Sequence, residues 1–323
     1  MTFTLKTFKA CPFCGGKIVK KYSGLPDRLD TTTKTFSIYE CVDCRGGVLS
    51  PMPVGDTASL YPTNYLSGED QAEVVASKFD LEKWYRNNQY KYDFNLLKRA
   101  SGPDMKATAS YLDIGCGSGE RVSFAREQGC QKSFGVDRFD FAKNKSRHED
   151  TLINSEILDY TPTQKFQVAS LFHVLEHVEN PREILAHIKD SILAKNGYVM
   201  IQVPNYASFE SRLFKRKWFG LDVPRHLWHF NAQALEGMLK DAGYTIEGTY
   251  QVNAPLHPVS IVSSIFRDLD VQRIWINRSH GSAYKKFMKL LWAVLTILTI
   301  PLTIVQNLFN RSSMLTVVAS NKQ

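Results

Sequence analysis

Short runs of apolar residues alternate with amphipathic stretches through the middle of the chain. The strands and helices that this pattern predicts cover, in order, residues 110–114, 120–129, 133–137, 140–147, 151–153 and 167–172. Strands that alternate with helices form a parallel sheet with helices on both faces. The pattern therefore predicts an α/β fold for the central part of the chain.

The alternation continues toward the C-terminus. An Asn-Pro pair at 180–181 is typical of a helix start, with proline in the first helical position, and we expect this helix to reach about Ala194. Residues 198–203 form an apolar run typical of a buried strand. Asn231 is expected to cap a further helix, and residues 244–250 to form a strand after it.

A glycine-rich turn follows the first predicted strand, in the stretch YLDIGCGSGE (residues 111–120). Gly115, Gly117 and Gly119 can bring backbone N–H groups close to a small polar ligand at the start of a helix. The spacing differs from the G-x-G-x-x-G of dinucleotide loops, and the Gly-Lys-Ser/Thr of phosphate loops is absent. Asp113, just before the turn, suits a ligand with a positively charged amino group.

This D-x-G-x-G-x-G string resembles motif I of class I S-adenosylmethionine-dependent methyltransferases. Phe134 to Asp137 (FGVD) resembles the next strand, which ends in an acid that can accept both ribose hydroxyls. Residues 171–181 (LFHVLEHVENP) resemble the fourth strand and following turn of the small-molecule branch that includes the quinone O-methyltransferases. Three matching stretches in the right order identify the chain as a member of the family, although Asp137 alone also fits a solvated acid at a strand end.

The resemblance implies a Rossmann-like, mostly parallel sheet whose last strand, residues 314–320, is antiparallel. It also implies S-adenosylmethionine as the cofactor. The residues expected to contact it are Asp113, Gly115, Gly117, Gly119, Asp137, Glu156 and Phe172. Asp113, Gly115 and Gly117 would face the methionine part, Asp137 the ribose and Glu156 or its neighbours the adenine, which Phe172 and His173 would flank. Glu156 departs from the family's usual Gly-Asp at that position.

An alcohol or phenol acceptor benefits from a general base, and histidine titrates in the right range. His173 and His177 lie in the string H-x-x-E-H at the end of the predicted fourth strand, and His226 lies in the string P-R-H-L-W-H-F. We expect His177 or His226 to be the catalytic base. His173 can instead pack beside the cofactor, and the alternative for His229 is a hydrogen-bonded residue near the helix cap.

The H-x-x-E-H string has a second interpretation. Two histidines at positions i and i+4 with an acid between them can bind a divalent metal where the stretch is helical. The corresponding segment of the quinone O-methyltransferases is E-x-x-E-H, so His173 replaces an acid here. The fourth strand also lacks the Asn/Asp-Pro-Pro-Tyr/Phe element of amino-directed methyltransferases, which argues against N-methylation.

The N-terminal region carries two C-x-x-C pairs, Cys11 with Cys14 and Cys41 with Cys44. Two such pairs, each followed by glycines, predict a tetrahedral four-cysteine zinc site, a zinc ribbon. Two disulfides are the alternative, which the absence of a secretory signal disfavours. Four thiolates leave no open position on the metal, so the zinc is expected to be structural. Residues 34–40 alternate like a strand between the pairs.

The net charge of +8 is concentrated near the C-terminus, because no acid follows Asp270. The basic residues there are Arg273, Arg278, Lys285, Lys286, Lys289, Arg311 and Lys322. Beside them, residues 290–305 carry no charge and include Pro301. We expect a helical hairpin kinked near Pro301 that lies on an anionic membrane surface, with basic residues at the headgroups. A buried core helix or a dimer interface is the alternative.

Five regions follow from these patterns. They are a zinc ribbon (1–55), a helical connector or lid (56–105), the methyltransferase core (106–250), a helical, apolar, membrane-contacting insertion (251–313) and the last core strand (314–323). Residues 71–100 are rich in aromatic residues, which fits a packing face better than a lid. We expect the protein to be cytoplasmic and peripheral on the inner face of the membrane.

The predicted activity is O-methylation of a sugar in a lipid-linked or cell-surface glycan. The glycan rests on the resemblance of the ribbon and connector to bacterial enzymes of polysaccharide biosynthesis, including sugar C-methyltransferases that carry a further domain absent here. A quinone-like lipid phenol is an alternative acceptor. RNA is another, but the basic residues of the ribbon form no clear stripe interleaved with aromatic residues. A non-catalytic binding module is disfavoured by the intact motif I and Asp137.

Overall fold

The computed structural model describes residues 3–62, 81–101, 110–138, 151–251, 259–269, 273 and 282–322. The predicted helix at 140–147 lies outside these residues, as do residues 63–80 of the connector and the side chains of Lys285, Lys286 and Lys289. The chain divides into two compact units. We call Met1–Tyr65, Pro204–Ala234 and Gln251–Leu315 the cysteine unit, and Leu66–Val203, Leu235–Tyr250 and Thr316–Gln323 the sheet unit.

The sheet unit is built on a seven-stranded sheet with the strand order β12-β13-β10-β9-β6-β7-β8. These strands are β6 (Tyr111–Ile114), β7 (Ser133–Asp137), β8 (Leu152–Asn154), β9 (Phe166–Phe172), β10 (Leu193–Pro204), β12 (Thr245–Tyr250) and β13 (Met314–Ser320). The pairs from β10 to β8 are parallel, whereas β13 is antiparallel to β12. The predicted sheet, mostly parallel with an antiparallel last strand, is confirmed.

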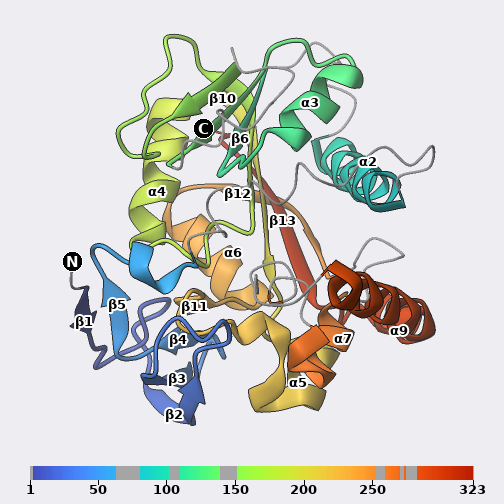
Figure 1. The fold of residues 1–323 in the computed structure, drawn as a ribbon. Helices are drawn as coiled ribbons and strands as arrows, with labels where there is room; N and C mark the ends of the chain where they lie inside the picture. Colours follow the sequence, from blue (N-terminus) through green and yellow to red (C-terminus); the bar gives the residue numbers. More distant parts are fainter. Residues whose placement is uncertain are drawn as a thin grey trace. The chain divides into compact units, whose positions relative to one another are not determined.

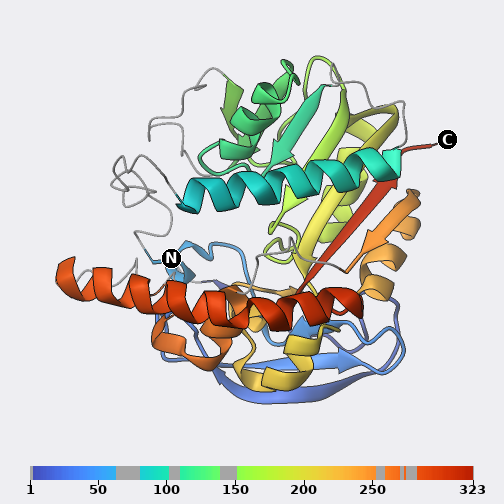
Figure 2. The same ribbon diagram turned by 90° about the vertical axis from the view of Figure 1, so that its right-hand side faces the viewer.

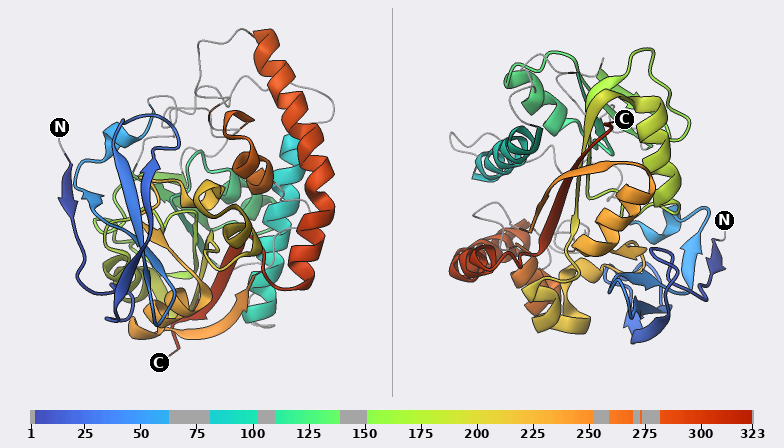
Figure 3. Two further views of the ribbon diagram at one scale, coloured as in Figure 1. Left: turned by 90° about the horizontal axis from the view of Figure 1, so that it is seen from below. Right: turned by 180° about the vertical axis from the view of Figure 1, so that it is seen from behind.

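Helices cover both faces of this sheet. Helices α2 (Leu81–Ser101) and α3 (Glu120–Glu127) lie on one face, and α4 (Pro181–His187) and α6 (Ala232–Asp241) on the other, as Figures 1 and 3 show. Asn231 caps α6 as predicted, because its Oδ1 accepts the N–H of Ala234 at 2.8 Å. Asn180 makes no such side-chain bond to α4, although Pro181 takes the expected first position.

The helix that starts at Pro181 ends earlier than predicted. It closes in a π-helical turn (Ile188–Ile192), and β10 begins at Leu193 rather than at residue 198. Leu193 pairs with Phe166 of β9, and its side chain is fully buried. Pairing within the sheet outweighs the local helical preference here, because burial of a leucine side chain contributes about 1.5–3 kcal/mol.

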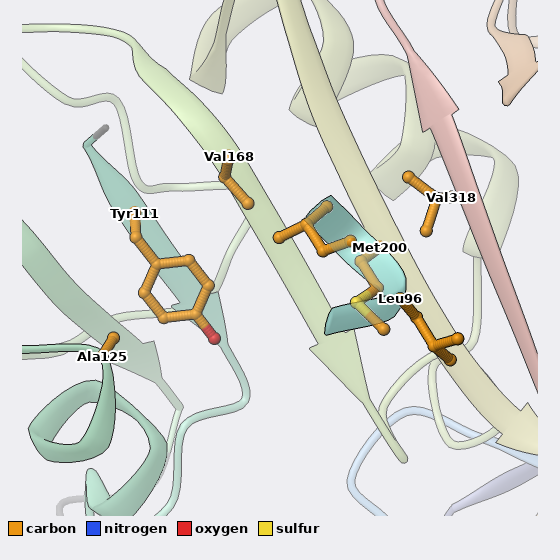
Figure 4. Close-up of a cluster of buried hydrophobic side chains, with 7 residues drawn as sticks. Leu96, Tyr111, Ala125, Val168, Met200 and Val318 are labelled. Carbon is orange, nitrogen blue, oxygen red and sulfur yellow. The ribbon is translucent and has the colours of Figure 1, made fainter. Parts of the chain in front are cut away.

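The core of the sheet unit joins α2 and α3 to the central strands. Leu96 from α2 lies against Met200 and Val318, while Tyr111 and Val168 come from neighbouring strands (Figure 4). Leu97 is buried in the same cluster. The described part of the connector therefore packs as a core helix, with burial of each leucine contributing about 1.5–3 kcal/mol.

The cysteine unit contains two small antiparallel sheets. Strand β1 (Thr4–Lys6) pairs with β5 (Met52–Val54). The second sheet has the strand order β11-β4-β3-β2. Its strands are β2 (Ile18–Pro26), β3 (Thr35–Cys41), β4 (Gly47–Leu49) and β11 (Trp228–His229). The long blue strands of this sheet are seen from below in Figure 3. The strand predicted between the cysteine pairs is therefore present.

The described part of this unit also includes the helices α5 (Phe209–Phe214), α7 (Val259–Ile265) and α9 (Ser282–Leu308). Short 3-10 turns lie at Ala58–Leu60 (η1), Lys215–Lys217 (η6), Phe219–Leu221 (η7) and Arg267–Leu269 (η8). The predicted hairpin is wrong, because α9 is one helix that runs through Pro301 (Figure 2). Met288 of α9 packs against Val262 and Leu269, with Trp292 beside it.

Candidate functional site

The glycine turn after β6 has the geometry of a ligand-binding loop. Gly115, Gly117 and Gly119 all have positive φ angles, of 72°, 53° and 78°, which side chains rarely tolerate. A Cβ at Gly115 would lie 2.3 Å from Val174, and one at Gly119 2.7 Å from Leu152. At Gly117 no described atom lies within 4 Å of that position. The outer two glycines are thus required for packing, and the middle one leaves room for a close ligand.

Asp137 ends the neighbouring strand β7 and contacts this turn directly. Its Oδ2 accepts the N–H of Gly117 at 2.9 Å, and its carbonyl accepts the N–H of Ser155 at 3.0 Å. Glu156 follows at the end of β8 and is exposed. Gly117, Asp137 and Glu156 therefore lie at the carboxyl ends of β6, β7 and β8, which are adjacent and parallel. Ligands bind at this edge in open α/β sheets.

Asp113 lies inside this end of the sheet rather than at its surface. Its side chain accepts hydrogen bonds from Ser170 Oγ at 2.6 Å and from the Tyr111 hydroxyl at 3.3 Å. Burial raises the pKa of the Asp113 carboxyl, and the nearby Arg121 guanidinium opposes that shift. Asp113 can therefore act on a bound ammonium group by charge while its Oδ1 stays hydrogen-bonded within the protein.

Phe172 ends β9, and His173 follows it. The Phe172 ring stacks against the Arg121 guanidinium, whose carbon lies 3.4 Å from the ring centroid. His173 is exposed, and its Nδ1 lies 3.3 Å from Glu176 Oε1. The backbone N–H of His177 bonds to the Val174 carbonyl in a turn. Residues 173–177 are not helical, so the helical i, i+4 geometry on which the metal interpretation depended is not present in this segment.

The pair of Arg121 and Asp93 was not foreseen from sequence. Arg121 Nη1 donates to Asp93 Oδ2 at 2.8 Å, and both side chains are largely buried. Gln202 Nε2 donates to the same carboxylate at 3.1 Å. Asp93 belongs to α2, far from the glycine turn in sequence, and only the packing of α2 reveals the pair.

His226 belongs to the cysteine unit and is buried. Its Nδ1 lies 2.9 Å from the carbonyl oxygen of Gly220. A carbonyl only accepts hydrogen bonds, so Nδ1 carries a proton, and in the neutral imidazole Nε2 then carries the lone pair. This is the tautomer in which Nε2 can accept a proton as a general base. His229, by contrast, lies buried on β11 opposite Gly47.

A buried ion pair network fixes the backbone just before His226. Arg225 donates from Nε and Nη2 to Asp222 and from Nη1 to Asp27 at 2.9 Å, with its side chain fully buried. Burial raises the pKa of the Asp222 carboxyl, but the Arg225 guanidinium outweighs burial and holds that pKa well below its usual range. The His226 N–H donates to the Asp222 carbonyl at 3.0 Å.

The four N-terminal cysteines come together as predicted. Cys11 Sγ lies 3.6 Å from Cys44 Sγ, and Cys14 Sγ lies 3.5 Å from Cys41 Sγ. All four sulfur atoms lie within 4.8 Å of one another. A tetrahedral zinc ion with bonds of about 2.3 Å separates its sulfur ligands by about 3.8 Å. The arrangement therefore fits a zinc ion, and burial raises the pKa of the Cys11 thiol to about 11 in its absence.

Each cysteine pair closes in a turn that suits metal coordination. The residue after each pair has a left-handed backbone, Gly15 with φ 77° and Arg45 with φ 59°. The Asp43 N–H points to Cys41 Sγ at 3.4 Å. The turns thus direct backbone N–H groups toward sulfur, as thiolate ligands require.

The cysteine centre also holds the segment around His226. Strand β11 pairs with β4, and Phe13 packs against Trp228 and Phe230 at centroid distances of 5.6 and 5.4 Å. Asn231 Nδ2 donates to the Cys44 carbonyl at 2.8 Å. The ribbon thus serves as a scaffold for residues 228–231.

The α/β sheet and the glycine turn indicate a ligand site at the carboxyl ends of the strands, and comparison with known proteins identifies the family. Residues 84–248, half of the chain, match a family of methyltransferase domains. The chain belongs to this family, and it is an S-adenosylmethionine-dependent methyltransferase of class I. No curated protein gives a significant match.

Solved structures share the fold at low identity. A phosphoethanolamine N-methyltransferase from Haemonchus contortus, bound to S-adenosylmethionine, is 15% identical with a TM-score of 0.50, covering 95% of this chain and 70% of its own. An S-adenosylmethionine-dependent methyltransferase from Archaeoglobus fulgidus is 18% identical with a TM-score of 0.43, covering 75% of this chain and 100% of its own. An S-adenosylmethionine-dependent methyltransferase from Mesorhizobium loti is 15% identical with a TM-score of 0.44, covering 71% of this chain and 97% of its own.

Proposed function

We propose that this enzyme methylates a hydroxyl group of a sugar in a lipid-linked or cell-surface glycan. The observation that carries the proposal is the exposed apolar face of α9, which fits an enzyme that works on a lipid-borne acceptor. A cytoplasmic enzyme, peripheral on the inner face of the membrane, would meet such acceptors there. A quinone-like lipid phenol is the second candidate, because it would be reached from the same surface.

The proposed reaction is an in-line displacement. The acceptor oxygen forms a bond to the methyl carbon, the bond from that carbon to the sulfonium sulfur breaks, and S-adenosylhomocysteine leaves. The hydroxyl proton passes to a histidine, so charge and atoms balance. In the proposed cofactor site Asp137 holds the ribose, the turn of Gly115, Gly117 and Gly119 approaches the methionine part, and Glu156 and Phe172 flank the adenine. Positioning supplies much of the rate.

We propose His226 as the base, because its tautomer places the lone pair on Nε2, with His177 and His173 as the alternatives. Replacement of His226 by Gln should lower kcat by about 10²–10⁴-fold, the usual contribution of a general base. Affinity for S-adenosylmethionine should stay unchanged in this variant. The measurement is turnover and calorimetric cofactor binding for His226→Gln beside His177→Gln and His173→Gln. Full activity in His226→Gln, with loss in one of the other two, would move the role to that residue.

The membrane-facing surface is proposed from the outer side of α9. Residues spaced by three or four positions along this helix are exposed: Phe287, Leu290, Val294, Ile297, Leu298, Ile304, Val305 and Leu308. Leu290–Leu308 is long and apolar enough to cross a membrane, and 11% of it is buried. Packing of the opposite side on Val262 and Leu269 favours a helix that lies on the surface.

Basic residues beside this face indicate an anionic surface. The Phe209 N–H bonds to the Arg311 carbonyl at 2.9 Å, which joins the start of α5 to the segment after α9. Phe209 and Leu213 on α5 are exposed. The cations Arg212, Lys215, Arg216, Lys217 and Arg311 are exposed near them. An apolar face bordered by cations fits anionic lipid headgroups.

Charges on the apolar face should abolish vesicle binding. Leu290→Glu with Leu298→Glu removes two insertions of about 1.5–3 kcal/mol each, so the partition coefficient should fall at least about a hundredfold. The measurement is flotation with vesicles that contain anionic phospholipid. The control is Thr33→Glu with Ser59→Glu, at exposed polar positions of the same unit. Equal flotation of both double variants would rule out α9 as the contact.

We further propose that Cys11, Cys14, Cys41 and Cys44 hold a structural zinc ion. The sulfur separations and the closed four-thiolate donor set support this assignment, and such a set leaves no position for substrate. The metal would stabilise the scaffold on which β11 rests and take no part in methyl transfer.

RNA is a third candidate acceptor with one observation in its favour. Lys20 lies 5.6 Å from the Tyr39 ring, and Lys21 lies 5.7 Å from the Tyr22 ring, on β2 and β3. Lys21 also pairs with Glu40, which reduces the positive charge there. Affinity for bulk RNA that falls steeply with salt would support this candidate over the glycan.

A further inference from the structure

Helix α2 contacts the segment that follows the glycine turn. The Tyr90 hydroxyl donates to Glu120 Oε2 at 3.2 Å, and Arg86 Nε lies 3.2 Å from the same oxygen. One turn further along, Asp93 pairs with Arg121 at 2.8 Å. Residues spaced by three or four positions lie on one face of a helix. One face of α2 therefore holds the two residues that start α3.

Arg121 is enclosed on several sides. Its guanidinium carbon lies 3.4 Å from the centroid of the Phe172 ring and 4.4 Å from that of Tyr90. Its side chain is 11% exposed. Asp93 is held in turn by Gln202, whose Nε2 also donates to Thr316 Oγ1 at 2.9 Å. The Arg121–Asp93 pair is thus fixed in place before any ligand binds.

The charges here do not cancel. Asp93 pairs with the Arg121 guanidinium at 2.8 Å, and Asp113 also interacts with it electrostatically. With both carboxylates ionised, these three described side chains together carry one excess negative charge. Asp137 adds to the negative potential at Asp113. An uncompensated charge away from water is costly, and a cationic ligand relieves that cost. We call Asp93, Asp113 and Arg121 the acid cluster.

The two ligands of a methyltransferase differ in charge at one atom. S-adenosylmethionine carries a sulfonium, an ammonium and a carboxylate, with net charge +1. S-adenosylhomocysteine has a neutral thioether in place of the sulfonium and is neutral overall. We propose that the acid cluster makes the site prefer S-adenosylmethionine to S-adenosylhomocysteine, with Asp93 and Arg121 as the residues that set the preference. The proposal rests on the cofactor site proposed above.

This preference would assist product release. Once the methyl group has left, the positive charge at sulfur is gone, and the cluster attracts the ligand less strongly, through its ammonium group alone. After the product has left, the excess negative charge of the site favours binding of the next S-adenosylmethionine molecule. The cluster therefore acts on the difference between substrate and product, while the adenosine contacts stay the same for both.

The preference should depend on pH. Burial raises the pKa of both the Asp93 and the Asp113 carboxyls, and Arg121 opposes the shift. The ionised form attracts the cation, so affinity for S-adenosylmethionine should be high above these raised pKa values and fall as pH drops through them. The groups that face the two carboxylates are Tyr111, Cys116, Arg121, Asp137, Ser170, His173, Gln202 and Thr316.

The test is calorimetric measurement of both dissociation constants, expressed as the ratio for S-adenosylhomocysteine over S-adenosylmethionine, at alkaline pH. Asp93→Asn removes a negative charge and should lower the ratio about tenfold, whereas Arg121→Met removes a positive charge and should raise it. The control is Glu127→Gln, which removes an exposed charge from the same helix as Arg121 and should leave the ratio unchanged.

A purely structural role for Asp93 and Arg121 would move the ratio in the same direction in both variants, or leave it unchanged, and either result overturns the proposal. Wild-type protein gives a test that needs no variant to fold, because its ratio should rise with pH. A ratio that is independent of pH would also overturn it. A wrong placement of the cofactor site would give a different result. In that case Asp137→Ala would bind both S-adenosylmethionine and S-adenosylhomocysteine with wild-type affinity.

Discussion

Removal of the zinc ion proposed for the four-cysteine centre is expected to unfold the cysteine unit. Cys11, Cys14, Cys41 and Cys44 close the turns that carry β3, β4 and the paired β11. Structural zinc contributes about 10–16 kcal/mol to the folding of small zinc modules, more than the 5–15 kcal/mol by which a typical domain is stable. Either a strong chelator or Cys44→Ser should therefore remove much of the strand signal in circular dichroism and abolish turnover.

The matched control is Cys130→Ser, because Cys130 is a half-buried cysteine of the sheet unit outside the cluster. This variant should retain one zinc ion per chain, measured by atomic emission, and lose only about 1 kcal/mol of stability. The sheet unit has its own core, so chelated protein should still bind S-adenosylmethionine. Purified protein without bound metal that unfolds at the same temperature with and without chelator would contradict the assignment.

Loss of the Asp137 carboxylate should have the largest effect on cofactor binding. This carboxylate accepts the Gly117 N–H and, in the proposed site, both ribose hydroxyls. Hydrogen bonds to a charged group contribute about 1.5–3 kcal/mol each, so Asp137→Ala should weaken S-adenosylmethionine binding by about a hundredfold or more. Asp137→Asn keeps one acceptor oxygen and should fall between Asp137→Ala and wild type.

Calorimetry on the same protein measures this effect directly. The control is Asp159→Asn, an exposed carboxylate in the turn that follows β8. It should bind the cofactor as wild type does. Unchanged affinity in Asp137→Ala, with the variant folded, would mean that the cofactor lies elsewhere on the sheet.

The parts that sequence predicted are those fixed by local pattern. The strand–turn–helix at 111–127, the acid at the end of β7 and the cap at Asn231 all depend on residues that are close together in the chain. The cysteine pairs were equally predictable, because each C-x-x-C pair is a local signal, although the close sulfur contacts join cysteines of different pairs. In each case the local preference and the tertiary packing agree.

The parts that sequence missed depend on distant partners. Arg121 and Asp93 lie far apart in the chain, and a charged pair on two predicted helices is ordinarily solvated. The pairing of β11 with β4 joins segments from opposite halves of the cysteine unit's sequence. Neither the ion pair nor the strand pairing produces a periodic pattern in the sequence, so both are visible only in the folded structure.

Helix α9 shows why a proline misled the prediction. Proline removes one backbone donor and usually kinks or ends a helix. Pro301 has no N–H to donate to the carbonyl one turn earlier in the helix. Because Pro301 is exposed, that carbonyl need not be buried without a partner. Beyond the proline, Thr303 and Gln306 are buried in the unit. Packing on both sides of Pro301 keeps the helix continuous over Ser282–Leu308.

The proposed reaction transfers a methyl group from S-adenosylmethionine to a hydroxyl of a lipid-linked glycan. The most direct measurement supplies methyl-labelled S-adenosylmethionine and purified protein with separated fractions of host lipids, lipid-linked glycans, soluble sugar nucleotides and RNA. We predict label in the lipid-linked glycan fraction, in a base-stable ether linkage, and none with Asp137→Ala. Label in RNA alone, or in none of the fractions while the cofactor binds, would contradict the claim.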